Sequence, residues 1–297
     1  MTETDSLQCF IFENRSVRGE MVRLNESFRT IMQQHAYPPV IQRILGEMLL
    51  AASLLGASIK FQGRITVQFQ GKGRARLLIA QSSDQLELRG FADCQPDLTW
   101  DELIADLKQG TLAIMMDPDR EGGQRYQGLV EWQGDSLSES LEHYFNRSEQ
   151  LPTRIKLAVN DERAAGFLLQ VMPRESARSG QLQDHQNEWE HLSHLTATLS
   201  PDELLTVDNA TLLHRLYVEE DVRLLPTRPV VFRCKCSLTR SENTLRLLTE
   251  QEIEEELRDK QSIVVTCEFC NREYVFDRVD VARIFKRGHS DSSGGIH

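Results

Sequence analysis

The chain has 297 residues, more than the roughly 100–200 of a typical domain, so its length predicts two folding units. Hydrophobic residues make up 40% and charged residues 27%, as in a soluble globular protein with a sizeable core. The net charge of −11 argues against binding to nucleic acid or anionic membranes, and the acidic N-terminus does not resemble a secretion signal. We therefore expect a cytoplasmic protein, whose thiols stay reduced.

The sequence of residues 1–178 predicts an α+β core domain with mostly antiparallel strands. The apolar stretch 48–59 has twelve residues, fewer than the about 20 needed to cross a bilayer, and is predicted to be a buried helix. Ser136 and Glu139 have the spacing of a capping box, which marks a helix start. Helices are expected at 46–55, 100–109 and 137–148, and strands at 64–69, 76–80, 86–92, 111–116, 125–132, 154–159 and 166–172, the first two forming a hairpin.

Residues 179–230 are predicted to be a metastable helical linker. The polar stretch 173–188 reads as a flexible connector, and Ser200 followed by Pro201 marks a later helix start. Short helices are poorly stable alone in water, so we expect the linker to pack on the core domain. Its apolar stripe comprises Trp189, Leu192, Leu195 and Leu199, which fall at helical spacing.

Residues 231–287 are predicted to be a small separate domain, and residues 288–297 a disordered tail. A capping box from Thr249 to Glu252 predicts one helix, and residues 280–285 a second. The alternating segment 262–276 predicts a hairpin with a CxxC motif at its turn. A domain this small has a thin core and often needs a staple.

Four of the six cysteines form a CxC motif, Cys234 and Cys236, and a CxxC motif, Cys267 and Cys270, with thirty residues between the motifs. Four thiolates brought together match the tetrahedral coordination of structural zinc. Four sulfur ligands leave no position for an activated water, so zinc-dependent hydrolysis is disfavoured. The pattern therefore predicts one zinc ion per reduced chain.

Two other classes of protein remain open on the residues alone. A thiol–disulfide oxidoreductase would use Cys267 and Cys270, but it would place the CxxC at a helix start and would leave the CxC unused. A constitutive zinc-ribbon interaction module would need the zinc ion only to stabilise its fold. Residues 231–297 carry eleven basic and twelve acidic side chains, which disfavours nucleic acid as its partner.

The remaining candidate residues carry no catalytic signature, so the chain is not expected to be an enzyme. Cys9 and Cys94 lack an accompanying His or Asp pattern and are interpreted as ordinary thiols. His191 and His194 lack a metal-binding pattern such as HExxH. Phosphate-binding and nucleophile-elbow motifs are also absent from the sequence.

The cysteine pattern at the end of an α+β domain resembles the redox-regulated holdase chaperones of the 33 kDa heat-shock protein family. Further stretches similar to that family cover nearly the whole chain: VRGEMVRL (17–24), LGEMLLAASLL (45–55), FQGKG (69–73), YQGLVEW (126–132), YFNRSEQLPT (144–153) and AAGFLLQVMP (164–173).

This resemblance implies a stress-response mechanism. In the reduced, inactive state all four cysteines would ligate zinc. Oxidation would pair Cys234 with Cys236 and Cys267 with Cys270, release the ion and unfold the linker. Residues 231–287 would then be a zinc-binding redox-switch domain. The linker's release would expose a surface for unfolded client proteins, without ATP, with Trp189, Leu192, Leu195 and Leu199 as the candidate client-binding residues. The activated chain would form a homodimer.

Overall fold

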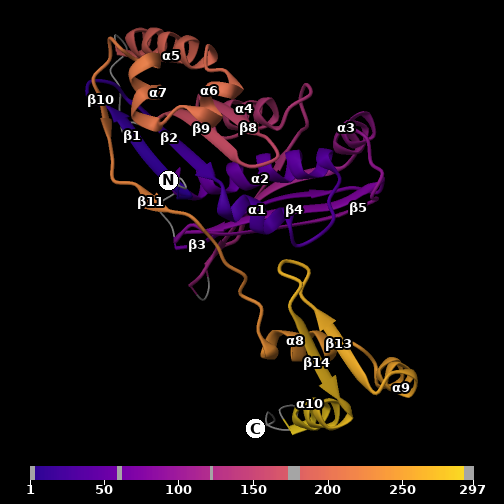
Figure 1. Cartoon of the computed structure of the whole chain (residues 1–297). Coiled ribbons are helices and arrows are strands. Elements are labelled where there is room, and N and C mark those ends of the chain that lie inside the picture. Colours follow the sequence, from indigo (N-terminus) through magenta and orange to yellow (C-terminus); the bar gives the residue numbers. More distant parts are fainter. Residues whose placement is uncertain (1–3, 59–61, 121–122, 173–180, 291–297) are drawn as a thin grey trace. The chain divides into compact units, whose positions relative to one another are not determined.

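The computed structural model describes residues 4–58, 62–120, 123–172 and 181–290. The chain divides into two compact units, Met1–Arg233 and Cys234–His297 (Figure 1). The fold is α+β, as predicted. Residues 179–180 at the start of the predicted linker and residues 291–297 of the predicted tail lie outside the described residues.

The first unit contains two six-stranded sheets. The first sheet has the order β10-β1-β2-β9-β8, with β11 also pairing with β1, and the second has the order β12-β5-β4-β3-β6-β7. Their pairings are antiparallel except for β12 with β5, which is parallel. The strands are β1 (Ser6–Phe12), β2 (Val17–Leu24), β3 (Gly63–Gln70), β4 (Ala75–Ser83), β5 (Glu87–Cys94), β6 (Thr111–Pro118), β7 (Tyr126–Val130), β8 (Thr153–Val159), β9 (Ala164–Val171), β10 (Val222–Leu224), β11 (Arg228–Pro229) and β12 (Val231–Phe232).

Helix α2 (Pro39–Ser58) contacts strands of both sheets and lies between them (Figure 1). It is longer than the predicted apolar stretch 48–59, whose last residue lies outside the described residues. Over Pro39–Ala57 it is long and apolar enough to cross a membrane, but 78% of that window is buried inside the protein. Its side chains Ile41, Leu45 and Leu49 belong to the main hydrophobic core. The burial identifies α2 as the central core helix of this unit.

The other helices of this region begin at recognisable caps. At α1 (Glu26–Met32), the Asp5 carboxylate accepts the amide hydrogens of Glu26 and Ser27 at 3.0 and 2.6 Å. At α3 (Trp100–Gln109), Thr99 and Glu102 form a complete capping box. The box predicted at α4 (Leu137–Arg147) is only half formed.

At α4, Ser136 Oγ accepts from the Glu139 amide at 3.1 Å, but the return bond of the box is missing from the described contacts. The Glu139 carboxylate lies instead against Gly134, where a Cβ atom would overlap its Oε2. Gly134 has a φ of 58°, a conformation that glycine adopts without strain. The Glu139 carboxylate thus lies beside the glycine turn that precedes the helix.

The predicted linker helices form on the first sheet. They are α5 (Gln181–Ala197), α6 (Pro201–Thr206) and α7 (Asn209–Leu216). Helix α5 begins within the stretch predicted to be a flexible connector, because Gln, Leu and Glu in that stretch are good helix formers. With β1, β2 and β9, these helices enclose a second hydrophobic core that includes Phe10, Phe167, Leu192 and Tyr217.

The second unit has a single hairpin, β13 (Ser262–Thr266) with β14 (Glu273–Asp277), as predicted. It is surrounded by α8 (Leu238–Leu245), α9 (Glu250–Asp259) and α10 (Arg278–Ser290). Thr249 and Glu252 form the predicted capping box of α9. Helix α10 continues past residue 287 to Ser290, into the range predicted to be a disordered tail. The core is small and is centred on Leu245, Phe276 and Ile284.

Candidate metal centre

The β13–β14 hairpin positions Cys267 and Cys270 at its turn. The Cys267 amide donates to the carbonyl oxygen of Arg272 at 2.9 Å. The Cys267 carbonyl oxygen in turn accepts from the amides of Cys270, at 3.3 Å, and Asn271, at 2.8 Å. Asn271 has a φ of 51°, a left-handed conformation that asparagine tolerates better than most residues. The turn therefore holds both sulfur atoms on one tight loop.

Cys234 and Cys236 lie in the extended segment between β12 and α8. On one side, the Arg233 amide donates to the carbonyl oxygen of Leu88 at 3.0 Å. On the other side, Ser237 caps α8 by accepting the Arg240 amide at 3.3 Å. The CxC motif is therefore held at both ends by ordered structure.

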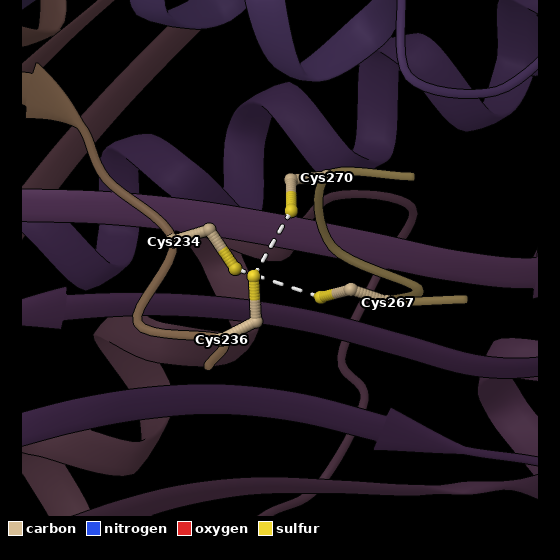
Figure 2. A group of neighbouring side chains, drawn as sticks. All are labelled: Cys234, Cys236, Cys267 and Cys270. Atoms are coloured by element: carbon tan, nitrogen blue, oxygen red, sulfur yellow. Dashed lines mark hydrogen bonds between the residues drawn. The ribbon is translucent and has the colours of Figure 1, made fainter. Parts of the chain in front are cut away.

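The four sulfur atoms converge from these two segments (Figure 2). All four lie within 4.8 Å of one another. The Sγ atoms of Cys234 and Cys267 are 3.6 Å apart, and those of Cys236 and Cys270 are 3.4 Å apart. All four thiols are free and half-buried. Among the described residues, this is the group of side chains that can hold a metal ion.

The thiols of the cluster differ in acidity. Burial raises the pKa of Cys270 to about 12 and also raises that of Cys234. At Cys236 the effect of burial is outweighed by hydrogen bonds from Tyr274 and the neighbouring cysteines, which lower the pKa to about 7. Neighbouring thiolates also repel one another, as like charges do at short distance. Four thiolates can coexist here only with a cation among them.

Tyr274 is a member of the site that the sequence analysis missed. Its hydroxyl group donates to Cys236 Sγ at 3.2 Å. It lies on β14, four residues after Cys270, so the predicted hairpin could have placed a donor there. A hydrogen bond to sulfur stabilises the thiolate form of a metal ligand.

The other two cysteines lie in the first unit. Burial raises the pKa of Cys9 to about 11 and also raises that of Cys94. Both are therefore poor nucleophiles near neutral pH.

The predicted linker stripe also lies in the first unit. Leu192 and Leu199 are buried in the second core, and Trp189 and Leu195 pack against it while partly exposed. The structure thus gathers the stripe on the first sheet.

The chain is similar to known proteins over almost its whole length. Residues 5–277 match the family model described as Hsp33 protein. The "33 kDa chaperonin" of Shewanella sp. (strain MR-4) is 42% identical over 290 residues, covering 97% of this chain and 98% of that protein. The protein of the same name from Shewanella frigidimarina has the same identity and coverage.

A solved structure has the same fold. The crystal structure of the 33 kDa chaperonin, or heat shock protein 33 homolog, from Thermotoga maritima superposes with a TM-score of 0.81. It covers 96% of this chain and 99% of that one, at 23% identity. Together with the sequence relatives, these matches show that the chain belongs to the Hsp33 family of chaperones.

Proposed function

We propose that the protein is an ATP-independent holdase of the cytoplasm, switched on by oxidation, that keeps unfolding proteins from aggregating during oxidative stress. The switch is the cluster of Cys234, Cys236, Cys267 and Cys270, and the element that it controls is the linker, residues 179–230. Membership of a chaperone family supports the client-binding role. The convergence of four thiols is the observation that carries the switch.

The ion that fits the cluster is zinc. A tetrahedral zinc site with Zn–S bonds of about 2.3 Å has sulfur–sulfur edges of about 3.8 Å. The observed separations of 3.4 and 3.6 Å, within an outer limit of 4.8 Å, are close to that value. Bound zinc would hold all four sulfurs as thiolates and join the CxC segment to the hairpin turn.

The second unit depends on that cross-link because its core is small. Among the described residues of this unit, seven buried apolar side chains form the core: Leu245, Ile253, Leu257, Ile263, Phe276, Val281 and Ile284. Structural zinc contributes on the order of 10 kcal/mol to the folding of comparable small domains. Loss of the ion should therefore unfold residues 234–290.

Oxidation removes the ligands by a balanced reaction. Each pair of thiolates loses two electrons and forms one S–S bond, and a peroxide accepts those electrons with two protons to give two water molecules. Two peroxides thus convert four thiolates into two disulfides, which no longer hold the ion. We propose Cys234–Cys236 and Cys267–Cys270 as the pairs.

The linker then loses the folded neighbour that follows it in the chain. Its helices α5–α7 cover apolar side chains of the first sheet, including Phe10, Met21 and Phe167. Their release would expose these groups together with the linker stripe. Such a contiguous apolar surface suits unfolded chains, and the activated protein is proposed to act as a homodimer.

The test uses the full-length chain purified under reductant. Metal analysis should find one zinc per chain, and the reduced protein should fail to suppress aggregation of a thermally unfolding client. Peroxide treatment should release the zinc and start the suppression, without ATP. A constitutive zinc module would act equally in both states, and an oxidoreductase would turn over a disulfide substrate. Either result would refute the proposal.

A further inference from the structure

The segment following α7 covers sheet edges with its main chain. Residues 221–233, here called the strap, contain β10, β11 and β12. The first two strands pair with the outer edge of β1, and the third pairs with β5. In Figure 1 the strap runs as an extended orange ribbon beside the first sheet. Main-chain hydrogen bonds thus hold the strap as an added strand, and side-chain contacts come in addition to them.

The pairing with β1 uses alternate residues of that strand. The Leu225 amide donates to the Cys9 carbonyl oxygen at 2.9 Å, and the Val230 amide donates to that of Asp5 at 3.1 Å. The Glu13 amide donates to the carbonyl oxygen of Asp221 at 3.0 Å. In an antiparallel sheet, the main-chain N–H and C=O groups of successive residues point to opposite neighbouring strands. The main-chain groups of the odd-numbered residues of β1 therefore face the strap, and those of the even-numbered residues face β2.

The sequence of β1, SLQCFIF, makes its outer edge prone to pair with other extended chains when the strap does not cover it. The strand has seven residues, with no charged side chain, no proline and no glycine. Apolar, uncharged strand edges of this length pair readily with other extended chains. Among the described strands, β10 and β11 are the partners of this edge.

The strap presents a much less adhesive edge of its own. Its paired strands have three, two and two residues. It also carries Pro226 and Pro229 together with Arg223 and Arg228. Short strands, prolines and charges are the features that stop edge-to-edge association. With the strap in place, the pairing-prone edge of β1 is covered, and the edge exposed instead is one that pairs poorly with other strands.

We propose that the outer edge of β1 is a client-binding strand, which takes an extended segment of an unfolded protein as an added antiparallel strand in the place of the strap. This inference rests on the proposed function, because it requires oxidation to release the strap. Main-chain hydrogen bonds are available in every polypeptide, so strand addition suits a chaperone that must accept many sequences.

The strap also indicates which client segments fit best. Val222 lies opposite Phe12 and Leu224 lies opposite Phe10, on the side of the sheet that carries the second core. Arg223, between them, points to the other side, because successive strand residues alternate. The favoured client segment therefore has apolar residues at every second position.

The test adds synthetic peptides of residues 219–232, which contain β10, β11 and β12 of the strap, to the oxidised, zinc-free full-length chain. The first peptide is unmodified. The second is N-methylated at Leu225, whose amide donates to the Cys9 carbonyl oxygen. The third is N-methylated at Leu224, whose amide is directed away from β1. The two methylated peptides have identical side chains and differ only in the edge that is blocked. The readouts are displacement of fluorescent reduced, carboxymethylated lactalbumin and hydrogen exchange at the Ile11 and Phe10 amides.

We expect the unmodified and Leu224-methylated peptides to displace the client, and the Leu225-methylated peptide to need roughly tenfold more or to fail. The Ile11 amide, which faces the strap, should exchange faster after oxidation and slow again when peptide or lactalbumin binds. The Phe10 amide, which faces β2, should stay protected throughout. The reduced chain should bind no peptide, because its own strap occupies the edge.

Equal displacement by all three peptides would overturn the inference, since side chains alone would then drive binding. So would lactalbumin binding without protection of Ile11, which would leave the proposed function intact and move the client elsewhere. Protection of Ile11 in the oxidised chain before any addition would also overturn the inference, because the edge would then stay covered by the strap or by a second copy. Failure of the oxidised chain to bind lactalbumin at all would instead refute the proposed function.

Discussion

The hydroxyl groups of Thr196 and Tyr217 lie 2.6 Å apart in a buried hydrogen bond within the predicted linker. Tyr217 is 2% exposed and contacts the rings of Phe10 and Phe12 in β1. Thr196 also donates to the Leu192 carbonyl oxygen at 2.8 Å. The bond joins the end of α5 to the end of α7 directly above the first sheet. The linker is therefore well packed in this structure, so its proposed release would have to break this hydrogen bond and uncover the Phe10 and Phe12 rings.

Leu192→Asp should activate the chaperone without an oxidant. Leu192 is fully buried against the first sheet, and a carboxylate there should cost about 3–5 kcal/mol, which is enough to release short helices. Leu195→Asp should act in the same direction but more weakly, because Leu195 is partly exposed. The measurements are client aggregation and zinc content of the reduced variants.

The matched control is His194→Asp, at an exposed position of the same helix. It should remain inactive until oxidised. If the linker of the Leu192 variant became sensitive to protease yet the variant still needed oxidation to bind clients, release of the linker would not control client binding.

Cys270→Ser or Cys234→Ser should lower zinc affinity severely and unfold residues 234–290, leaving the first unit folded. The reason is that three sulfurs and a hydroxyl are a poor zinc site and the remaining core is small. All three tryptophans, Trp100, Trp132 and Trp189, belong to the first unit, so their fluorescence reports on that unit alone. Removal of zinc by a chelator should have the same effect.

Cys9→Ser and Cys94→Ser provide matched controls for the loss of a thiol. Both residues are half-buried in the first unit, and these variants should retain one zinc per chain. Zinc loss from either control, or full zinc retention by Cys270→Ser, would contradict the four-cysteine site.

Local patterns in the sequence predicted most of the elements correctly. The hairpin at the CxxC motif, the capping box at Thr249 and the helix starting at Pro201 all follow from short-range spacing. The half-formed box at Ser136 shows the limit of such patterns, because the Glu139 carboxylate lies beside Gly134 in place of the expected return bond.

Long-range pairing could not be predicted from the same patterns. Strands β10, β11 and β12 have two or three residues each, too few to show an alternating pattern, and they exist because β1 and β5 offer open edges. The N-terminal cap of α1 is likewise Asp5, twenty residues before that helix's own cap position. Tyr274 was missed because sulfur hydrogen bonding has no sequence spacing of its own.

Partial oxidation should form the Cys267–Cys270 disulfide before the Cys234–Cys236 disulfide. The CxxC residues share one hydrogen-bonded turn, whereas a CxC disulfide closes a very small ring that requires backbone movement. Mass spectrometry of quenched time points would identify the pairs. Because Cys234 Sγ lies 3.6 Å from Cys267 Sγ and Cys236 Sγ lies 3.4 Å from Cys270 Sγ, disulfides between the motifs are the informative contrary result.

Arg15→Ala should lower the amount of oxidant needed for activation. Arg15, in the β1–β2 turn, makes two hydrogen bonds to Glu220, at 2.7 and 3.0 Å, just before the strap. The Glu220 side chain is 8% exposed, so removing its partner leaves a poorly solvated carboxylate and should cost about 2 kcal/mol. His191 Nε2 lies 3.3 Å from the same carboxylate.

Arg29→Ala, at an exposed position on α1, is the control for losing one positive charge. Its activation should match that of the unmodified chain. The measurements are hydrogen exchange of residues 181–230 and client aggregation at a series of peroxide concentrations. Unchanged exchange in Arg15→Ala would show that this ion pair does not hold the linker.

Glu47→Gln should stabilise the first unit at pH 8 and make little difference at pH 4. Glu47 lies buried on α2, and burial raises its pKa from 4.5 to about 7, although the Arg43 guanidinium 3.2 Å away favours the charged form. A raised pKa means that the folded state binds the proton more tightly than the unfolded state. The stabilising contribution is thus complete below about pH 4.5 and is lost as the pH rises through about 7.

Above pH 7 the folded protein must carry a buried carboxylate, and the shift corresponds to about 3 kcal/mol. Glutamine keeps an oxygen that can accept from Arg43 and removes that charge, so the variant's advantage should grow between pH 5 and pH 8. Denaturant unfolding followed by tryptophan fluorescence at several pH values measures it. Glu26→Gln, at an exposed carboxylate on α1, should show no such growth. A Glu47→Gln variant whose advantage is the same at pH 5 and pH 8 would assign the effect to packing rather than to titration.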